Sequence, residues 1–356
     1  MNRSKATHIA RKLAMALMTV LTIGLTACDS LIYDYEGDCD PHYKVRFRFD
    51  WNLHFADAFP HEVNAVTLYI VDPQSGNIVW QKSESGAALK EEGYLMDVED
   101  LAPGTYNLMA WCGEGVGPHF DVPEATHHTG LTCTLQRNHE TGHDGGTVRT
   151  DIKRLYHGRL DAQVFTEDEG THIYTVPLIK NTNEVNVVLQ HLSGEPVDKD
   201  DYTFTITAAN GSMDWDNHLL DDETITYYAH TTAGGTAGVI WPQGPDDPSV
   251  ETMGSRAPLT QMSACVASHT ISRLTTEQRK DVLVTVYNKK GEKILSIPLI
   301  DYALLVKGSY AKMDDQEYLD RQDKYDLVFF LDQGDRWMNA YIYINSWKLV
   351  LQDTEL

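Results

Sequence analysis

Residues 139–143 of this 356-residue chain read His-Glu-Thr-Gly-His, the residue pattern of a zinc protease. In such an enzyme the two histidines bind one zinc ion and the glutamate activates water. That arrangement requires a helix, because only a helix places both imidazoles on one face. Here Gly142 lies inside the pattern, Asp144-Gly145-Gly146 follows it, and no apolar periodicity flanks it. The sequence therefore predicts a loop rather than a catalytic zinc site.

Other catalytic patterns are missing from the sequence: it contains no G-x-S-x-G, P-loop or dinucleotide fingerprint. We predict that the protein is not an enzyme and has no cofactor and no resident metal. Weak metal binding stays open as an alternative, because histidine-rich loops of secreted proteins can bind zinc. The histidines concerned are His119, His127, His128, His139 and His143.

The first 27 residues have the composition of a secretory signal peptide. The segment MNRSKATHIARK has four basic residues and no acidic one, and Leu13–Ala27 is an apolar run that ends in small residues. The run is shorter than the roughly 18 apolar residues that a membrane-spanning helix needs.

Leu25-Thr26-Ala27-Cys28 is similar to a bacterial lipobox, in which an aliphatic residue and two small residues precede a cysteine. The small residues admit the signal peptidase, the thiol accepts a diacylglycerol, and the freed amine can take a further acyl chain. We therefore predict cleavage before Cys28, S-diacylglycerol and N-acyl modification of Cys28, and a tether over residues 28–42. Two or three acyl chains would hold the protein to a membrane. The alternative is an ordinary cysteine close to the end of the signal peptide.

The chain is strongly acidic. Its formal net charge is −23, which becomes −27 once the four basic residues of segment 1–27 are removed. Such a chain is not expected to bind nucleic acid, because the phosphate backbone would repel it. The charge is typical of a solvated surface that stays soluble on its tether.

Four cysteines remain after lipidation: Cys39, Cys112, Cys133 and Cys265. Outside the cytoplasm they can form disulfides, and four cysteines allow three pairings that the sequence does not distinguish. Cys112 and Cys133 lie in neighbouring strand-like runs, so we favour that pair. The alternative is that these residues are small buried apolar side chains.

Short strands with regular turn signals fill the rest of the chain. Tyr43–Trp51 alternates between apolar and polar residues, and the turn DPQSGN joins two strand-like runs. A short helical turn is expected in DIKRLYHG (151–158) and a short amphipathic helix or turn in DDQEYLDRQDKY (314–325). No long helical periodicity occurs, so we predict an all-β fold of two β-sandwiches, over residues 43–150 and 151–356.

The mature chain resembles the FimB-type fimbrial anchor and accessory lipoproteins of Bacteroidota, which belong to type V fimbriae. The likeness begins with the lipobox and with GDCDP. It continues in VRFRFDWNLHFADAF (Val45–Phe59), PGTYNLMAWCG, VPLIKNTNEVNVVLQHLSG, QEYLDRQDKYDLVFFL and the terminal YIYINSWKLVLQDTEL. None of these segments is a catalytic motif, and as an ordered set they cover essentially the whole mature chain.

The resemblance implies two transthyretin-like (Greek-key) sandwich domains on a lipid anchor in the outer membrane, exposed at the cell surface as part of a fimbrium. It implies attachment of a fimbrial shaft, a role in limiting shaft length, and assembly with a stalk subunit by β-strand complementation. The terminal run Trp337–Gln352 is either the exchanged element or the last core strand of the second domain.

A second hypothesis is that the protein is a surface lipoprotein that binds glycans, and a host protein or glycan is a possible partner. Exposed tryptophans can stack on sugar rings, and the candidates are Trp215, Trp241 and Trp337. Aromatic side chains in a β-sandwich are more often buried in its core.

Overall fold

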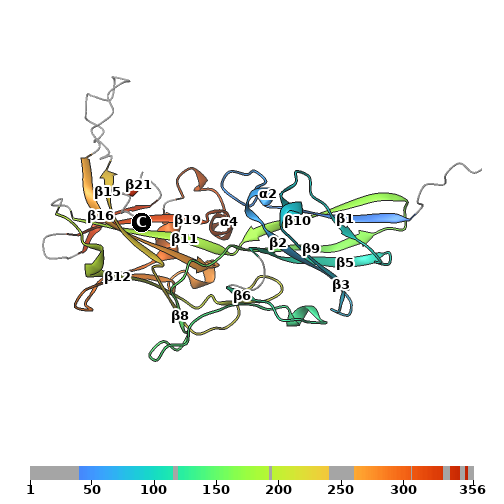
Figure 1. Ribbon diagram of the computed structural model, residues 1–356, viewed down its shortest axis with the longest axis horizontal. Coiled ribbons are helices and arrows are strands. Elements are labelled where there is room, and N and C mark those ends of the chain that lie inside the picture. The colour runs from blue at the N-terminus through green and yellow to red at the C-terminus, as the bar shows by residue number, and fades with distance from the viewer. Residues whose placement is uncertain are drawn as a thin grey trace, which may run out of the picture. The chain divides into compact units, whose positions relative to one another are not determined.

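The computed structural model describes residues 40–114, 119–191, 195–239, 260–305, 307–331, 337–344 and 349–351. The predicted signal peptide, the lipidation site and all but the last residues of the tether lie outside them. Residues 43–165 and 173–356, as far as they are described, belong to one compact unit, and residues 40–42 and 166–172 belong to another. Strands dominate the described chain, which confirms the all-β fold (Figure 1). The α-helices are short: α2 (Phe59–Glu62), α3 (Leu299–Leu305) and α4 (Asp315–Arg321).

The first sheet has seven strands in the order β3-β2-β5-β9-β10-β1-β4. Their bounds are β1 (Pro41–Arg48), β2 (Ala65–Val71), β3 (Ile78–Ser85), β4 (Met96–Val98), β5 (Gly104–Gly113), β9 (Leu155–Phe165) and β10 (Gly170–Lys180). The predicted alternation in β1 is confirmed, because Tyr43, Val45 and Phe47 are buried in one hydrophobic cluster. This cluster lines the inner face of the sheet.

The two end strands of this sheet, β3 and β4, come together, and side chains of β3 bond to the backbone at β4. Trp80 Nε1 of β3 donates a hydrogen bond to Glu99 O at 2.9 Å, and Lys82 Nζ donates to Asp97 O of β4 at 3.3 Å. The sheet therefore folds back on itself and encloses its own apolar cluster, as a sandwich does.

The second sandwich consists of two sheets. The six-stranded sheet has the order β20-β19-β11-β16-β15-β21, and the five-stranded sheet has the order β18-β17-β12-β14-β8. Bounds in the first of these are β11 (Thr182–His191), β15 (Thr231–Val239), β16 (Thr260–Ser272), β19 (Lys324–Leu331), β20 (Trp337–Ile344) and β21 (Leu349–Leu351). Bounds in the other are β8 (Thr147–Val148), β12 (Tyr202–Ala208), β14 (Ile225–Tyr228), β17 (Leu283–Asn288) and β18 (Lys293–Pro298).

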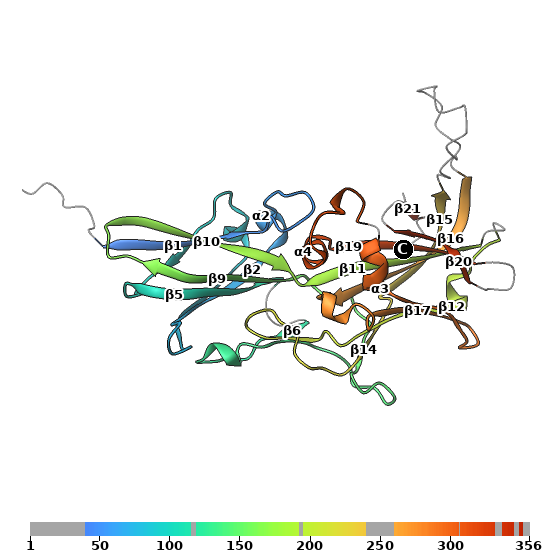
Figure 2. The same cartoon turned by 180° about the vertical axis from the view of Figure 1, so that it is seen from behind.

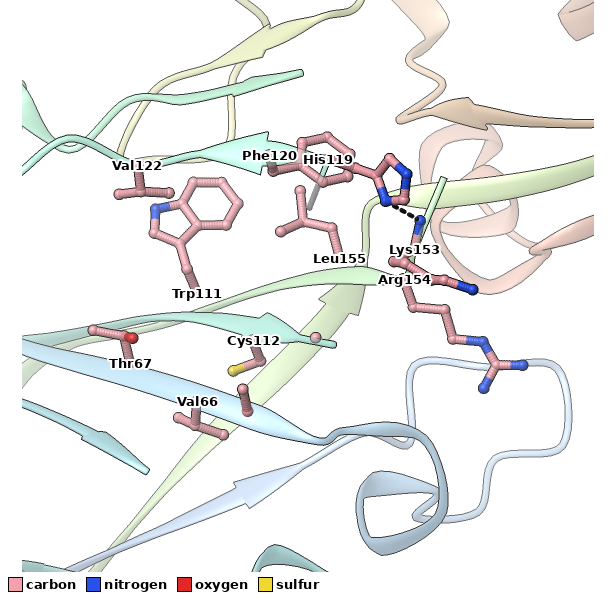
Figure 3. A pocket seen from close by; sticks show the side chains of 12 residues that line it. Val66, Thr67, Trp111, Cys112, His119, Phe120, Val122, Lys153, Arg154 and Leu155 are labelled. Carbon is pink, nitrogen blue, oxygen red and sulfur yellow. Dashed lines mark hydrogen bonds between the residues drawn. The ribbon is translucent and has the colours of Figure 1, made fainter. Parts of the chain in front are cut away.

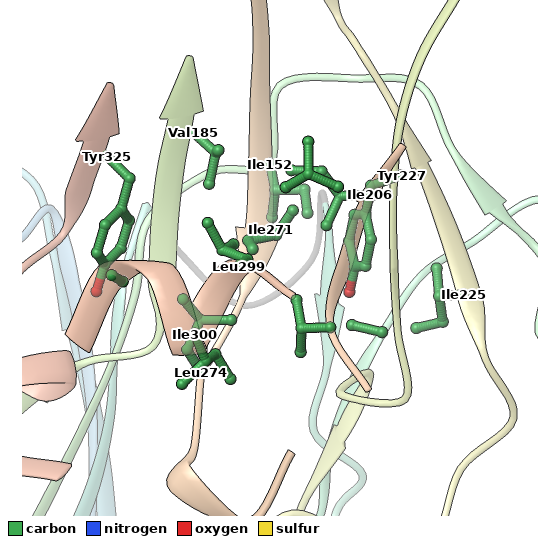
Figure 4. Packing of buried hydrophobic residues seen from close by; sticks show 14 of the residues in the cluster. Ile152, Val185, Ile206, Ile225, Tyr227, Ile271, Leu274, Leu299, Ile300 and Tyr325 are labelled. Carbon is green, nitrogen blue, oxygen red and sulfur yellow. The ribbon is translucent and has the colours of Figure 1, made fainter. Parts of the chain in front are cut away.

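The core of the second sandwich lies between these two sheets (Figure 4). Val185 and Tyr325 of the six-stranded sheet face Ile206 and Tyr227 of the five-stranded sheet, and all four are fully buried. Helix α3, which follows β18 directly, adds Leu299 and Ile300 to the same cluster (Figures 2 and 4). The predicted helix in segment 314–325 is confirmed as α4, whose N-cap Asp314 accepts hydrogen bonds from the N–H groups of Gln316 and Glu317.

A small three-stranded sheet covers part of the outer face of the first sheet. Its strands are β6 (Phe120–Asp121), β7 (Cys133–Leu135) and β13 (Ser212–Met213). Tyr69, Met109 and Trp111 point outward from β2 and β5, and they are buried in the same cluster as the second sandwich core. The apolar cores of the two sandwiches are therefore distinct, but the second extends over the back of the first.

The sheets do not divide at residue 150, where the sequence analysis places the domain boundary. Strands β9 and β10 follow that residue but belong to the first sheet, whereas β8 precedes it but pairs in parallel with β14 of the second sandwich. The predicted helical turn in segment 151–158 is also wrong, because β9 begins at Leu155. Two sandwich domains stay our proposal for the organisation of the chain, with the crossing between them moved to Asn181.

Asn181 is the single residue between β10 and β11, and it is completely buried. Its amide forms a reciprocal pair with Asn217: Asn181 Nδ2 donates to Asn217 Oδ1 at 2.6 Å, and Asn217 Nδ2 donates to Asn181 Oδ1 at 3.2 Å. Asn217 adopts a φ of 66°, a conformation that asparagine tolerates better than most residues. The pair fixes the crossing point because either amide would be left unsatisfied without the other.

Two buried histidines make the fold sensitive to acid. His157 Nε2–H donates to Trp215 O at 3.0 Å, and His269 lies between the carbonyl oxygens of Val185 and Phe204. Burial lowers the pKa of His157 to about 3 and that of His269 to about 4. Both side chains therefore stay neutral in the folded state at a pH where the unfolded chain takes up protons.

We expect the free energy of unfolding to fall as the pH drops below 6.5, the ordinary pKa of histidine. By pH 5 each of the two histidines should account for about 2 kcal/mol of that loss. Denaturant unfolding at pH 7.5 and pH 5.0 measures it. A His157→Gln variant should lose roughly half of this pH dependence. An unchanged dependence in that variant would show that His157 is not the responsible group.

Candidate functional site

The predicted lipidation site Cys28, together with Cys39, lies outside the described residues, so its chemistry stays a prediction. No helix in the described part of the chain is long and apolar enough to cross a bilayer.

Residues 139–143 form a loop, as the sequence predicts. The His143 N–H donates to Glu140 O at 3.1 Å and the Gly146 N–H donates to His143 O at 2.9 Å, which makes two consecutive turns. Gly142 has a φ of 89°, which suits glycine and does not occur inside an α-helix. The two imidazoles are therefore not presented on one helical face.

The polar side chains of this loop fasten it to neighbouring residues. The Glu140 carboxylate forms an ion pair with Arg149 and accepts a hydrogen bond from Thr147 Oγ1 at 2.9 Å, and these contacts lower the pKa of Glu140. The His143 ring lies within 3.2 Å of Thr226 Oγ1 and 3.4 Å of the Tyr228 hydroxyl, both in β14. A carboxylate held in this way is a weaker base than a free one, so the arrangement favours a structural role.

The other candidate metal-binding histidines are dispersed. His127 and His128 have ring centroids 4.6 Å apart, whereas His119 accepts a hydrogen bond from the Lys153 N–H. Within the described ranges, no group of three or more His, Cys, Asp or Glu side chains is arranged to hold a metal ion.

We expect purified protein to contain no stoichiometric zinc, because the His143 ring contacts Thr226 and Tyr228 instead of a second histidine. Plasma mass spectrometry after dialysis against a weak chelator measures the metal content. One zinc per chain that disappears in a His143→Ala variant would contradict the loop interpretation.

The favoured disulfide between Cys112 and Cys133 is wrong. Both cysteines are free and buried, as is Cys265. Cys112 points into the core of the first sandwich, and the adjacent Trp111 points to the other side of β5, toward the cluster that contains Cys133 (Figure 3). Alternation along β5 thus places the two thiols on opposite faces of the sheet. Burial raises the pKa of all three thiols, that of Cys265 to about 12, so they are small apolar core residues.

The terminal run Trp337–Gln352 supplies two strands to its own sheet. β20 pairs antiparallel with β19 at one end of the six-stranded sheet, and β21 pairs antiparallel with β15 at the other end. Strand β21 covers three residues of β15, from Gly235 to Ala237, whereas β15 is nine residues long. Much of the outer edge of β15 therefore has no ladder partner among the described strands.

One small cavity lies behind the outer face of β5 (Figure 3). Trp111, Phe120, Val122 and Leu155 are among the residues that line it, and its volume is about 30 Å³. This is room for one or two water molecules and too little for an organic ligand.

A second cavity, which we call the junction cavity, has a volume of about 420 Å³. It is formed where β9 and β10 of the first sheet meet the loops 214–219 and 273–277, and all of its lining residues belong to one compact unit. Its volume lies within the range of roughly 300–1,000 Å³ that is typical of ligand pockets. Trp51, Ile179 and Leu219 contribute apolar surface, and Asp216 and Glu277 contribute carboxylates.

The arginines of the junction cavity are held by carboxylates. Arg273 donates three hydrogen bonds to Asp320: Nη2 donates to Oδ1 at 2.9 Å and to Oδ2 at 3.2 Å, and Nε donates to Oδ1 at 3.3 Å. Arg273 Nη1 donates a further one to Asn217 O. Arg159 forms ion pairs with Asp161 and Asp216 and lies over the ring of Trp215, with Cζ 4.4 Å from the centroid. Neither guanidinium is therefore a free positive charge.

Of the three tryptophans proposed for sugar stacking, only Trp215 has a described side chain. It is partly buried, with the Arg159 guanidinium over its ring and the ring of His128 at 4.1 Å in an edge-on contact. The ring of Trp215 is thus covered by Arg159 and His128, whereas Trp51, which is not one of these three tryptophans, lines the junction cavity.

The sequence of the chain matches a family of known proteins. A sequence model of the fimbrillin-A associated anchor proteins Mfa1 and Mfa2 matches residues 35–353, which is most of the chain. The minor fimbrium anchoring subunit Mfa2 of Porphyromonas gingivalis is 25% identical over 246 residues, which are 66% of this chain and 71% of that protein. Its solved structure covers 88% of this chain with a TM-score of 0.61 at 18% identity, a likeness of fold.

Two solved structures from Bacteroides thetaiotaomicron are also similar. A candidate adhesin is 31% identical, covers 89% of this chain and 100% of its own, and superimposes with a TM-score of 0.72. A candidate polysaccharide-binding protein is 27% identical, with a coverage of 88% of this chain and 99% of its own and a TM-score of 0.70. The similarity therefore extends over both sandwiches.

Proposed function

We infer that this chain, which belongs to the family of fimbrillin-A associated anchor proteins, attaches a fimbrial shaft to the outer membrane. The observation that carries this proposal is the family match over residues 35–353, which leaves out little of the chain beyond the predicted signal peptide. The named relative, an anchoring subunit of a minor fimbrium, supports the same role. A structural protein also agrees with the absence of a catalytic motif from the sequence.

The membrane attachment is proposed to run through Cys28. Lipid on the Cys28 thiol and on its freed amine would hold the chain in the outer membrane at the cell surface. Each CH₂ group that enters the bilayer contributes about 0.8 kcal/mol, so two or three acyl chains bind stably where a single chain does not. The described strands begin at Pro41, which leaves a short tether between the lipid and the first sandwich.

The partner is proposed to be a fimbrial stalk subunit that assembles with the anchor by β-strand complementation. The outer edge of β15 supports this, because among the described strands β21 covers three of the nine residues of β15. An added strand would satisfy backbone N–H and C=O groups along the remaining edge. Small side chains predominate in β15, which reads TTAGGTAGV, so little would obstruct a neighbouring backbone. A fixed anchor of this kind would also limit the length of the shaft.

Deletion of the gene tests the anchoring role. We expect fimbriae that detach into the medium or change in length, and both return to normal when the gene is restored. Unaltered surface fimbriae, together with no stalk subunit in affinity purifications of the protein, would refute the proposal.

Glycan binding at the cell surface is a second candidate function. The observation that favours it is the junction cavity, which has the volume of a ligand pocket. The similar Bacteroides thetaiotaomicron structure described as a candidate polysaccharide-binding protein supports it as well. Affinity electrophoresis with a set of polysaccharides tests it, and no retardation by any of them would exclude it.

A further inference from the structure

The lining of the junction cavity combines apolar and polar side chains. Trp51, Pro177, Ile179 and Leu219 contribute apolar surface, and Asp216, Thr275 and Glu277 contribute polar groups. A sugar ring has the same division, with apolar C–H groups on its faces and hydroxyls around its edge. Apolar walls with a few placed polar groups are typical of small-molecule sites.

The free charge of the cavity is negative. Arg273 is bonded to Asp320, and Arg159 is bonded to Asp161 and Asp216, so neither arginine is available to bind an anion. Glu277 is exposed and forms no ion pair within the described part of the chain. On a chain with a net charge of −23 the free Glu277 carboxylate would repel an acidic ligand and accept hydrogen bonds from hydroxyl groups.

One buried polar atom of the cavity has no hydrogen-bond partner among the described residues. This atom is Thr275 Oγ1, and Thr275 lines the cavity. A buried hydroxyl without a partner is unfavourable, so a ligand hydroxyl that reaches it gains a hydrogen bond that the free protein lacks.

The walls are held rigidly. The Arg321 guanidinium lies 4.5 Å from the centre of the Trp51 ring and 4.7 Å from that of Phe55, and Arg321 Nη1 donates to Asp50 O at 3.0 Å. On the other side, Gln316 accepts from the Thr276 N–H at 2.9 Å and donates to Leu274 O at 3.2 Å. A site with fixed walls binds more tightly, because little conformational entropy is lost on binding.

We propose that the junction cavity binds an uncharged saccharide unit. The ring face of the sugar packs on Trp51 and the neighbouring apolar side chains, and its hydroxyls bond to Asp216, Glu277 and Thr275. This inference deepens the second candidate function and is independent of fimbrial anchoring.

The test uses purified full-length protein in detergent on a glycan array that holds neutral hexose and N-acetylhexosamine oligosaccharides beside uronic-acid and sulfated ones. Calorimetric titration with the strongest neutral ligand follows, for the wild type and for Glu277→Gln and Thr275→Val. We expect Glu277→Gln to weaken binding about tenfold or more, because a hydrogen bond to a charged acceptor is lost. Thr275→Val should weaken it severalfold, and its shape is close enough to threonine to keep the fold.

Glu92→Gln is the matched control, since it changes an exposed carboxylate away from the cavity and should leave the affinity unchanged. If no glycan on the array binds, neutral or acidic, both the site and the glycan-binding function are refuted. If only acidic glycans bind, the proposed ligand class is wrong. If neutral glycans bind the wild type and both cavity variants equally, glycan binding stands but the junction cavity is not its site.

Discussion

A Cys28→Ala variant is expected to disappear from the membrane fraction and to release its fimbrial shafts into the medium. The lipobox Leu25-Thr26-Ala27-Cys28 supplies the only thiol at the predicted cleavage site, and alanine has no sulfur to carry a diacylglycerol. Since the acyl chains supply all of the proposed membrane affinity, the loss should be complete rather than partial. Metabolic labelling with a palmitate analogue, followed by fractionation, measures the loss of acylation and of membrane location, and electron microscopy of the culture medium measures the released shafts.

Cys39→Ala is the matched control, because it removes a cysteine eleven positions further along and leaves the lipobox intact. It should keep the acyl label and the membrane location of the wild type. A Cys28→Ala protein that still carries label and still sediments with the outer membrane would contradict the proposed anchor.

An Arg273→Met variant is expected to lose about 3–5 kcal/mol of folding free energy, the range typical of one partner removed from a buried ion pair. The Arg273 and Asp320 side chains are only 11% and 7% exposed, and burial raises the pKa of Asp320 even with Arg273 beside it. Without Arg273 the Asp320 carboxylate would keep one hydrogen bond, from Gln316 Nε2 at 3.0 Å. Chemical denaturation at pH 7.5 measures the change.

Replacing both partners distinguishes two contributions to the free energy of unfolding: the net contribution of the ion pair, and the penalty of leaving one buried charge unpaired. The double variant Arg273→Met, Asp320→Leu should recover much of the lost stability, because no unpaired charge is left in the core. The exposed pair Lys289–Asp201 serves as the control, and Lys289→Met should have no measurable effect. Equal losses in the single and double variants would refute this explanation.

Strands and turns of the fold follow from local patterns. The alternation from Tyr43 to Phe49 predicts β1, the turn at residues 72–77 predicts the β2–β3 hairpin, and the segment around Asp314 predicts α4. The pairing between sheets does not follow from such patterns, because it depends on contacts between distant residues. Nothing in β9 itself indicates that it pairs with β5 instead of with strands of the second sandwich.

For the candidate sites, too, the sequence predicts what local residues determine and does not predict what depends on contacts between distant residues. The glycines at and after Gly142 are local signals, and they suffice to predict a loop at residues 139–143. Whether the thiols of Cys112 and Cys133 can meet depends on which face of β5 the small sheet covers. The spacing of the two residues in the sequence does not indicate that face, and the structure shows both cysteines free. The junction cavity is lined by segments around residues 51, 159, 216 and 275, which lie far apart in the sequence. No single stretch of the sequence therefore predicts it.

Labelling of isolated fimbriae tests the central claim most directly. Gold-conjugated antibody against this chain is applied to fimbriae released from the outer membrane by detergent, and electron micrographs record the position of each label. An anchor predicts a label at one end of each shaft, the end that was held in the membrane. Labels along the whole shaft, or shafts without any label, would contradict the claim that this chain holds the fimbria to the cell.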